Sequence, residues 1–192
     1  DLNSDGLSDL LVAEPENGQL TAYLQKADGT LGAPKTVPTL TGVSELVAGD
    51  WDRDGQTEIF LLSTDERQIG VTRMDGNGRI AFPNILATEG RPLTMAAGAL
   101  TPKAKPSLVA IADLDGKREL QIVGPDQEVR RQKLSANFKS NPRSVTIHDV
   151  NQDGLADVVI LVPFEKIRVL LQVEGKDFDE QEVAPPGGST DQ

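Results

Sequence analysis

The segment VAGDWDRDGQTEI at residues 47–59 returns in altered form as TIHDVNQDGLADV at residues 146–158. The chain also opens with DLNSDGLSDL, which is the same unit beginning at its first aspartate. The three units start at Asp1, Asp50 and Asp149, which are 49 and then 99 residues apart. Because the second interval is about twice the first, the period is about fifty residues, and a further copy is expected near residue 99.

The sequence near residue 99 keeps the spacing of the repeat and has lost its acids. Ala97 and Gly98 stand where Ala48 and Gly49 stand in the second copy, and an apolar run at residues 108–111 follows at the expected distance. Three residues replace the aspartates: Ala99, Thr101 and Lys103. We therefore expect no metal ion in this third copy.

A rival register places the third loop later, in ADLDGKREL at residues 112–120, which resembles a loop of the same type shortened by two residues. That choice makes the spacing of the copies uneven. We favour the even register, in which Asp115 and Gly116 form a hairpin turn that matches Asn17-Gly18 in the first repeat.

Between the acidic loops, short alternating apolar runs are broken by glycine, aspartate and asparagine. Pairs such as Asn17-Gly18 and Asp28-Gly29 are typical of turns in β-hairpins. No segment sustains the 3.6-residue period of a helix. The pattern predicts an all-β fold of about four β-propeller blades, each with four antiparallel strands. A stacked solenoid is the alternative.

We interpret residues 1–192 as a single propeller segment with repeats at 1–49, 50–98, 99–148 and 149–184, followed by a linker or frayed tail at 185–192. The chain begins at a loop that follows a fourth strand, and its last repeat ends after a third strand near Val183. We therefore expect the segment to belong to a larger propeller or an open array of blades, with a closed four-bladed propeller as the alternative.

The acidic loops have the spacing of calcium ligands. In the second loop, oxygen-bearing side chains stand at positions 1, 3, 5 and 9, glycine allows a sharp turn at position 6, and position 7 offers its carbonyl. Ca²⁺ accepts six to eight oxygens in a flexible geometry, whereas Mg²⁺ demands a tight octahedron. The predicted ligands, with the seventh residue acting through its carbonyl, are Asp1, Asn3, Asp5, Leu7 and Asp9; Asp50, Asp52, Asp54, Gln56 and Glu58; and Asp149, Asn151, Asp153, Leu155 and Asp157.

These loops differ from an EF-hand, which needs a bidentate glutamate at position 12 on a helix. The twelfth residues are Val12, Leu61 and Ile160, each in a strand-like apolar run. The loops DLNSDGLSDLLV, DWDRDGQTEIFL and DVNQDGLADVVI instead resemble those of FG-GAP repeats and the similar VCBS repeats, found in integrin α-subunit propellers and in secreted or surface bacterial proteins. The resemblance implies Ca²⁺ ligation by these residues, with about three ions per chain, and an extracellular, cell-surface or periplasmic location.

Composition narrows the classes of partner. The formal net charge is −11, which disfavours nucleic acid and anionic membrane surfaces. The chain has no cysteine, which excludes disulfides and thiolate zinc sites, and no apolar stretch long enough to span a bilayer. The third repeat is locally basic, a feature that suits an acidic partner or a solvated face: Lys103, Lys105, Lys117, Arg118, Arg130, Arg131 and Lys133.

No set of catalytic residues stands out, and we expect the chain not to be an enzyme. His148, the single histidine, is interpreted as a strand residue before the loop, and Trp51 as a packing residue rather than a sugar-stacking platform. The leading hypothesis is a binding or adhesion module, with structural Ca²⁺, whose partners are a protein or glycan ligand and other blades of its parent chain. The alternatives are a portion of a secreted enzyme acting on polysaccharide or lipid, and a purely structural spacer.

Overall fold

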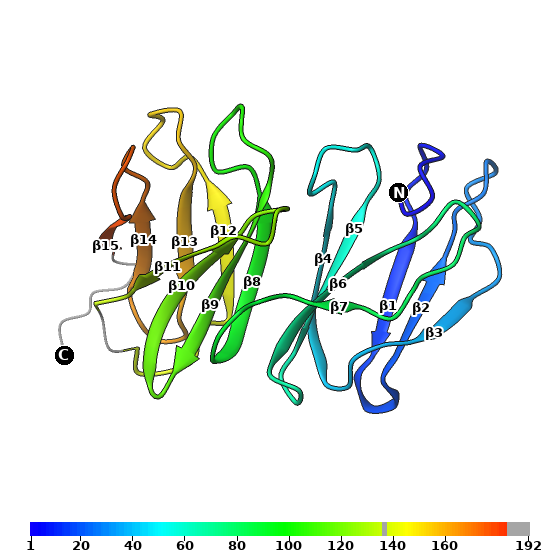
Figure 1. Ribbon diagram of the computed structural model, residues 1–192, viewed down its shortest axis with the longest axis horizontal. Helices are drawn as coiled ribbons and strands as arrows, with labels where there is room; N and C mark the ends of the chain where they lie inside the picture. Colours follow the sequence, from blue (N-terminus) through cyan, green and yellow to red (C-terminus); the bar gives the residue numbers. More distant parts are fainter. Residues whose placement is uncertain (136–137, 184–192) are drawn as a thin grey trace. The chain divides into compact units, whose positions relative to one another are not determined.

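A computed structural model describes residues 1–135 and 138–183, and the expected tail at 185–192 lies outside them. The described part is all-β, with four antiparallel sheets and one short 3-10 helix, η1, at Pro15–Asn17 (Figure 1). The predicted fold class is thereby confirmed, with sheets of three or four strands that have the form of propeller blades. Within these residues, no helix is long and apolar enough to cross a bilayer.

The chain divides into two compact units, Asp1–Thr88 and Glu89–Gln192. The first unit holds a three-stranded sheet and a four-stranded sheet, whose strands are β1 (Leu10–Glu14), β2 (Gln19–Tyr23) and β3 (Lys35–Pro38), then β4 (Val43–Gly49), β5 (Glu58–Ser63), β6 (Gln68–Arg73) and β7 (Asn84–Ile85). The second unit holds two four-stranded sheets, whose strands are β8 (Arg91–Gly98), β9 (Ser107–Leu114), β10 (Lys117–Val123) and β11 (Val129–Lys133), then β12 (Ser144–His148), β13 (Asp157–Leu161), β14 (Ile167–Leu171) and β15 (Asp179–Val183).

The sheets are offset from the sequence repeats by one strand. Strands β4, β8 and β12 come at the end of a sequence repeat, and each pairs with the first strand of the repeat that follows. The long loop of each four-stranded sheet therefore joins its first strand to its second. The first sheet begins with β1, directly after the first loop.

The strand ladder confirms the even register of the third repeat. Asp115 and Gly116 form the two-residue turn between β9 and β10, with positive φ angles of 53° and 84°. Positive φ at both central residues is typical of the type I′ turn, whose twist matches that of paired strands. The rival metal loop is excluded, because Asp113 lies within β9 and Glu119 within β10.

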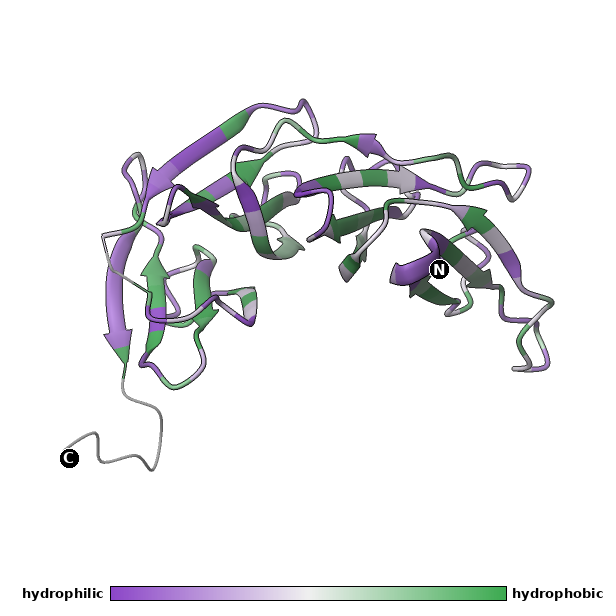
Figure 2. Ribbon diagram, turned by 90° about the horizontal axis from the view of Figure 1, so that it is seen from below, coloured by the Kyte–Doolittle hydropathy of each residue, from purple (hydrophilic) through white to green (hydrophobic). Residues whose placement is uncertain are grey.

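Each unit has its own aliphatic core. All six residues of β5 are buried, and Leu20, Ile59 and Leu61 are among the buried residues of the first unit's core. Val109, Ile111 and Ile160 belong to the core of the second unit. The edge strand β15 is polar and mostly exposed, and Figure 2 shows hydrophilic colouring along it.

Candidate metal centre

Three loops share one set of hydrogen bonds, and we number their positions from the first aspartate: the first loop at residues 1–9, the second at 50–58 and the fourth at 149–157. In each, the carboxylate at position 1 accepts the main-chain N–H groups of positions 5 and 6, at distances between 2.8 and 3.2 Å. The position 5 carboxylate accepts the N–H of position 7. These acids therefore fold the main chain around themselves, as expected for residues that form Asx turns.

Two positions of the shared loop have left-handed backbone. Position 4 has φ near +60° in all three, at Ser4, Arg53 and Gln152, and position 6 is a glycine with φ between 84° and 89°. The left-handed region costs an ordinary residue free energy because Cβ approaches the carbonyl oxygen, so glycine suits position 6. The sequence places glycine there in each loop, and the strained conformation at position 4 has no such signal.

The ninth residue fastens the loop to the sheet. Its carboxylate accepts the main-chain N–H of position 2 at 2.7 Å from Leu2, 2.8 Å from Trp51 and 2.9 Å from Val150. In the first and fourth loops, the same carboxylate also accepts a main-chain N–H from the neighbouring strand connection, given by Gln25 and Gln172. Position 9 is therefore held in place by main-chain hydrogen bonds of the protein itself.

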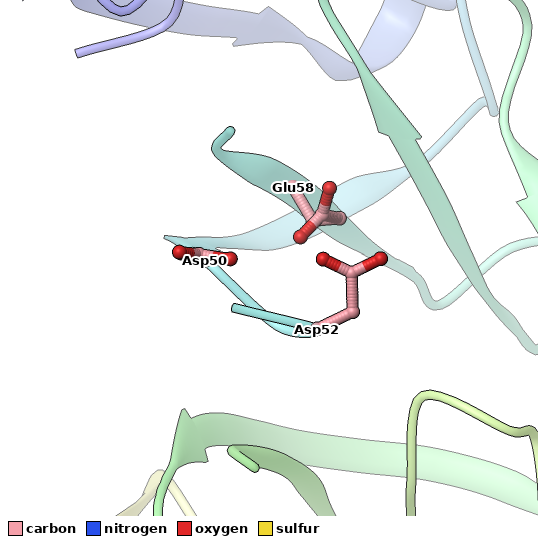
Figure 3. Close-up of side chains that lie close together, drawn as sticks. All are labelled: Asp50, Asp52 and Glu58. Carbon is pink, nitrogen blue, oxygen red and sulfur yellow. The ribbon is translucent and has the colours of Figure 1, made fainter. Parts of the chain in front are cut away.

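The second loop brings three carboxylates together. Ligand oxygens of Asp50, Asp52 and Glu58 all lie within 4.8 Å of one another, and Figure 3 shows the three carboxylates facing a common space. Within the described ranges, this is the one group of three or more His, Cys, Asp or Glu side chains that meets this distance. Three like charges this close repel one another, and a divalent cation among them removes that repulsion.

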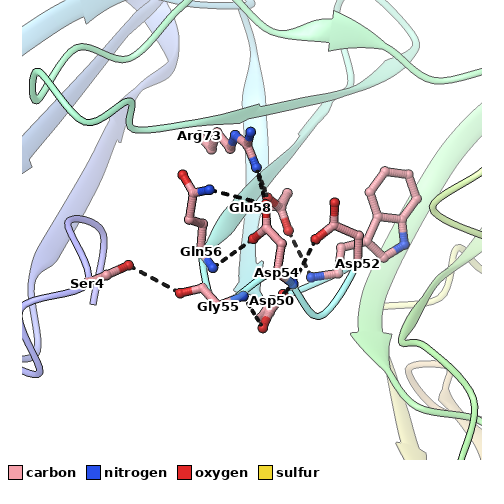
Figure 4. A network of polar contacts seen from close by, with 9 residues as sticks. Ser4, Asp50, Asp52, Asp54, Gly55, Gln56, Glu58 and Arg73 are labelled. Carbon is pink, nitrogen blue, oxygen red and sulfur yellow. Dashed lines mark hydrogen bonds and ion pairs between the residues drawn. The ribbon is translucent and has the colours of Figure 1, made fainter.

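Asp54 does not belong to this group and is bonded to Arg73 and Gln56. Its Oδ2 accepts from the Arg73 guanidinium at 2.8 Å and from the Gln56 amide at 3.1 Å (Figure 4). Arg73 lies at the end of β6, opposite Glu58 in the ladder, and its Nη1 is 3.5 Å from Glu58 Oε1. The local motif does not reveal Arg73; only the pairing of β5 with β6 places it beside the loop.

The titration of the second loop reflects this crowding. Burial raises the pKa of the Glu58 carboxyl above its ordinary value, outweighing the hydrogen bond from the Trp51 N–H, and the charges of Asp52 and Asp54 raise it further. The pKa of Asp54 is lowered by the Gln56 N–H and by Arg73. The loop thus holds one acid, Glu58, whose charge is disfavoured, and another, Asp54, whose charge is stabilised, and a cation would favour the charged form of Glu58.

The first and fourth loops carry a neutral residue at position 3. Asn3 and Asn151 each donate a side-chain N–H to the position 5 carboxylate, Asp5 and Asp153, at 2.9 Å. That bond and the Leu7 N–H lower the pKa of Asp5. These two loops have one carboxylate fewer than the second, and their acids do not converge as closely in the described structure. The predicted carbonyl ligands Leu7, Gln56 and Leu155 occupy equivalent positions, and their ligation stays a prediction.

Two other residues singled out in the sequence have structural roles. His148 ends β12 and pairs with Asp157, as predicted for a strand residue before the loop. Trp51 is 6% exposed and packs edge-on against Phe60, with ring centroids 5.2 Å apart, so it is not an exposed platform for a sugar.

Part of the positive charge of the third repeat, that of its arginines, is paired with acids within the second unit. Three of its arginines form ion pairs with acids, and the pairs are Arg118 with Asp113, Arg130 with Asp177, and Arg131 with Glu89. These arginines already have acidic partners, so they add little to a surface for an acidic ligand.

The donor set fits a hard cation. Oxygen side chains converge in the second loop, thiolates are absent from the chain, and the described side chains bring no histidine into this group. Ca²⁺ prefers such oxygen ligands and completes its shell with water. Asp50, Asp52 and Glu58 are the residues whose described geometry fits the ion best.

Comparison with known proteins agrees with this assignment of the repeat. Residues 1–61 match the model of the FG-GAP-like repeat. Among curated proteins, no match was found. Two similar solved structures are each named "putative 6-phosphogluconolactonase". The protein from Bacteroides uniformis has 13% identity and a TM-score of 0.58, over 92% of this chain and 53% of that one. The protein from Bacteroides fragilis has 18% identity and a TM-score of 0.56, over 86% and 50%.

At these identities the structural likeness supports the fold alone, and the chain spans about half the length of those two proteins. The family match carries more weight for the loops, because it covers the first loop and the second. Residues 1–61 of this chain are therefore similar to an FG-GAP-like repeat, as the acidic loops predicted.

Proposed function

We propose that this chain is a Ca²⁺-stabilised extracellular binding or adhesion module, in which ions fix the acidic loops and other loops receive a protein or glycan ligand. The observation that carries the proposal is the convergence of Asp50, Asp52 and Glu58 in a loop whose hydrogen bonds recur in two further loops. Repetition of one hydrogen-bond pattern in three loops argues against an accidental cluster of surface acids.

The ions have a structural role in this proposal. Each loop contains three or four carboxylates that repel one another without a cation, so metal binding contributes to folding free energy. Extracellular calcium modules bind with dissociation constants of about 10⁻⁴ to 10⁻³ M. At 10 mM Ca²⁺ each such site adds about 1.4–2.7 kcal/mol to the free energy of unfolding. Sites this weak require abundant calcium, which favours a location outside the cytosol.

The test is chemical denaturation of the chelator-stripped protein, titrated with Ca²⁺ and separately with Mg²⁺, with bound metal counted by elemental analysis. We expect a rise in stability with Ca²⁺ that exceeds the rise with Mg²⁺, and about three ions per chain. Asp149→Ala is expected to remove one ion, whereas Glu16→Gln, an exposed acid outside the loops, is expected to remove none. Equal curves with and without Ca²⁺ would contradict the proposal.

An enzymatic function is the competing hypothesis, and the names of the two structural neighbours suggest hydrolysis of a sugar lactone as one activity to assay. Our proposal is that the chain is not itself catalytic. Turnover of 6-phosphogluconolactone, or of a polysaccharide or lipid ester, that is lost in a variant with a folded structure would contradict this part of the proposal.

A further inference from the structure

A pocket of about 800 Å³ lies within the second unit, and its lining includes the turn that joins β13 to β14. Its volume falls in the range of small-molecule sites. Its lining combines apolar side chains with four cations, and the residues used below are Lys139, Arg143, Leu161, Phe164, Lys166 and Arg168. None of the acidic loops contributes to it, so this pocket is separate from the candidate metal centre.

Phe164 is the unusual residue of this pocket. Its side chain is fully exposed, and its backbone has a φ of +62°. A bulky residue in the left-handed region is an outlier, and burial does not compensate for its strain here. Leu161, which also lines the pocket, is 45% exposed. An exposed apolar wall is therefore held beside the cations.

Buried polar contacts hold the pocket in shape. The Glu165 carboxylate accepts the main-chain N–H groups of Lys139 and Ser140 and pairs with Arg168 at 3.1 Å, and both charged side chains are 8% exposed. Burial disfavours the charge of Glu165, yet these hydrogen bonds and Arg168 hold its pKa below its ordinary value. The Arg143 N–H donates to the Leu161 carbonyl at 2.8 Å, which fixes the start of the Arg143 side chain next to the pocket wall.

The charges of the pocket do not balance. Arg168 and Lys166 face the two acids of the lining, Glu165 and Glu182, through contacts between 3.1 and 3.5 Å. Within the described residues, Lys139 and Arg143 make no ion pair with an acid. The pocket thus retains two uncompensated positive charges in a chain whose net charge is −11. Such a site concentrates anions locally.

We propose that this pocket binds an acidic sugar, with its carboxylate between Lys139 and Arg143 and an apolar face of its ring against Phe164. Arginine donates in a planar fork that matches a carboxylate. An inorganic anion would leave the exposed aromatic and aliphatic wall unused, whereas a sugar ring presents C–H groups to it. The inference rests on the glycan-binding part of the proposed function and is independent of calcium.

The test compares methyl glucuronide with methyl glucoside, two probes that differ only in the carboxylate, by NMR titration of the whole chain in Ca²⁺ and in chelator. The variants are Arg143→Gln, which removes one free charge, and Phe164→Gly, which removes the ring and suits a positive φ. Lys105→Gln, in the third loop, is the control with the same change of charge. Denaturation curves show whether each variant is folded.

We expect methyl glucuronide to bind and methyl glucoside to bind at least about tenfold more weakly, because a hydrogen bond to a charged group has an effect of that size. Arg143→Gln should weaken glucuronide binding by about tenfold, and Phe164→Gly should weaken it while leaving stability equal or higher. Lys105→Gln should change neither the affinity for glucuronide nor the stability of the protein.

Equal binding of the two sugars would overturn the proposal, as would equal affinity for inorganic phosphate or unchanged binding in Phe164→Gly. A short peptide with a free C-terminal carboxylate is a further probe. If this peptide binds saturably and glucuronide does not bind, the proposal is overturned in favour of a protein ligand. Absence of glucuronide binding in a protein that gains stability with Ca²⁺ would refute this pocket alone. Glucuronide binding in a protein whose stability does not respond to Ca²⁺ would refute the calcium proposal alone.

Discussion

The second and third loops occupy the same place in their sheets and have different chemistry. Gly49 pairs with Glu58 at the base of the second loop, and Gly98 pairs with Ser107 at the base of the third. The two loops therefore have the same length and connect the first strand of a sheet to its second. His148 and Asp157 close the fourth loop in the same way.

The third loop lacks more than the acids. Pro102 stands at position 4, where Arg53 has a φ of +61° in the second loop. Proline is restricted to a φ near −65°, so the backbone of the acidic loops is closed to this sequence. Ala104 replaces the glycine of position 6, and its N–H donates to the Thr101 carbonyl in a different turn. The Ala156 N–H from the fourth loop donates to the carbonyl of Leu100.

The strand ladder therefore does not depend on the acidic loop. The sheet of β8–β11 has the same order as the sheet of β4–β7, although its loop cannot form the shared hydrogen bonds. The acids are thus an addition to a sheet that pairs without them, and their effect can be measured by changing the loops.

The largest effect is expected from Glu58→Ala. The variant loses a ligand and leaves the buried Trp51 N–H without its acceptor, which costs about 1–3 kcal/mol in chelator. In 10 mM Ca²⁺ the loss should grow by about 1.4–2.7 kcal/mol. Chemical denaturation measures both terms. The matched variant at the same position of the third loop, Ser107→Ala, should shift stability by less than about 0.5 kcal/mol, and equal losses in the two would refute the assignment.

Rebuilding the third loop is the next test. A variant with Asp at residues 99, 101, 103 and 107 and Gly at residues 102 and 104 should bind a fourth ion, adding about 1.4–2.7 kcal/mol in 10 mM Ca²⁺. The same variant that keeps Pro102 should bind none, because proline cannot adopt the position 4 conformation. Elemental analysis counts the ions. A fourth ion in both variants would show that the backbone conformation at position 4 does not determine whether the loop binds Ca²⁺.

A smaller effect is expected at the loop glycine. Gly55 has a φ of +84°, and no other atom lies within 4 Å of the place that a Cβ would take, so Gly55→Ala adds backbone strain without a clash. We expect a loss of about 1 kcal/mol in chelator. Ala104→Gly, at the equivalent position of the third loop, should lose less stability, since the backbone at residue 104 does not have a left-handed conformation. Thermal unfolding of the two variants measures the difference.

The smallest effect concerns the second and fourth loops, which differ at position 3. Asn151→Asp gives the fourth loop the same number of carboxylates as the second and should tighten its Ca²⁺ binding, since ligand charge sets affinity. It also removes the amide hydrogen bond to Asp153, so stability in chelator should fall by about 0.5 kcal/mol. Weaker Ca²⁺ binding in the variant, by calorimetric titration, would contradict the role of position 3 as a ligand.

Much of the fold was predictable because its signals are local. Turn pairs such as Asp115-Gly116 and short apolar runs mark hairpins within a few residues. The period of about fifty residues then predicted four units of strands. The packing of Trp51 against Phe60 was harder to predict from the sequence, because it requires the paired strands to be in place.

By itself, the sequence determined which loops carry acids, where glycine permits the turn, and that the third loop has lost its acids, because these features are set by the residues of a single loop. The incompatibility of Pro102 with the shared loop rests on the positive φ at position 4, which only the structure shows. Tertiary structure alone decided that Arg73 stands beside Glu58 and forms an ion pair with Asp54. It also decided that Arg143 and Phe164 share one pocket. These residues are far apart in sequence, and only strand pairing and side-chain packing bring them together.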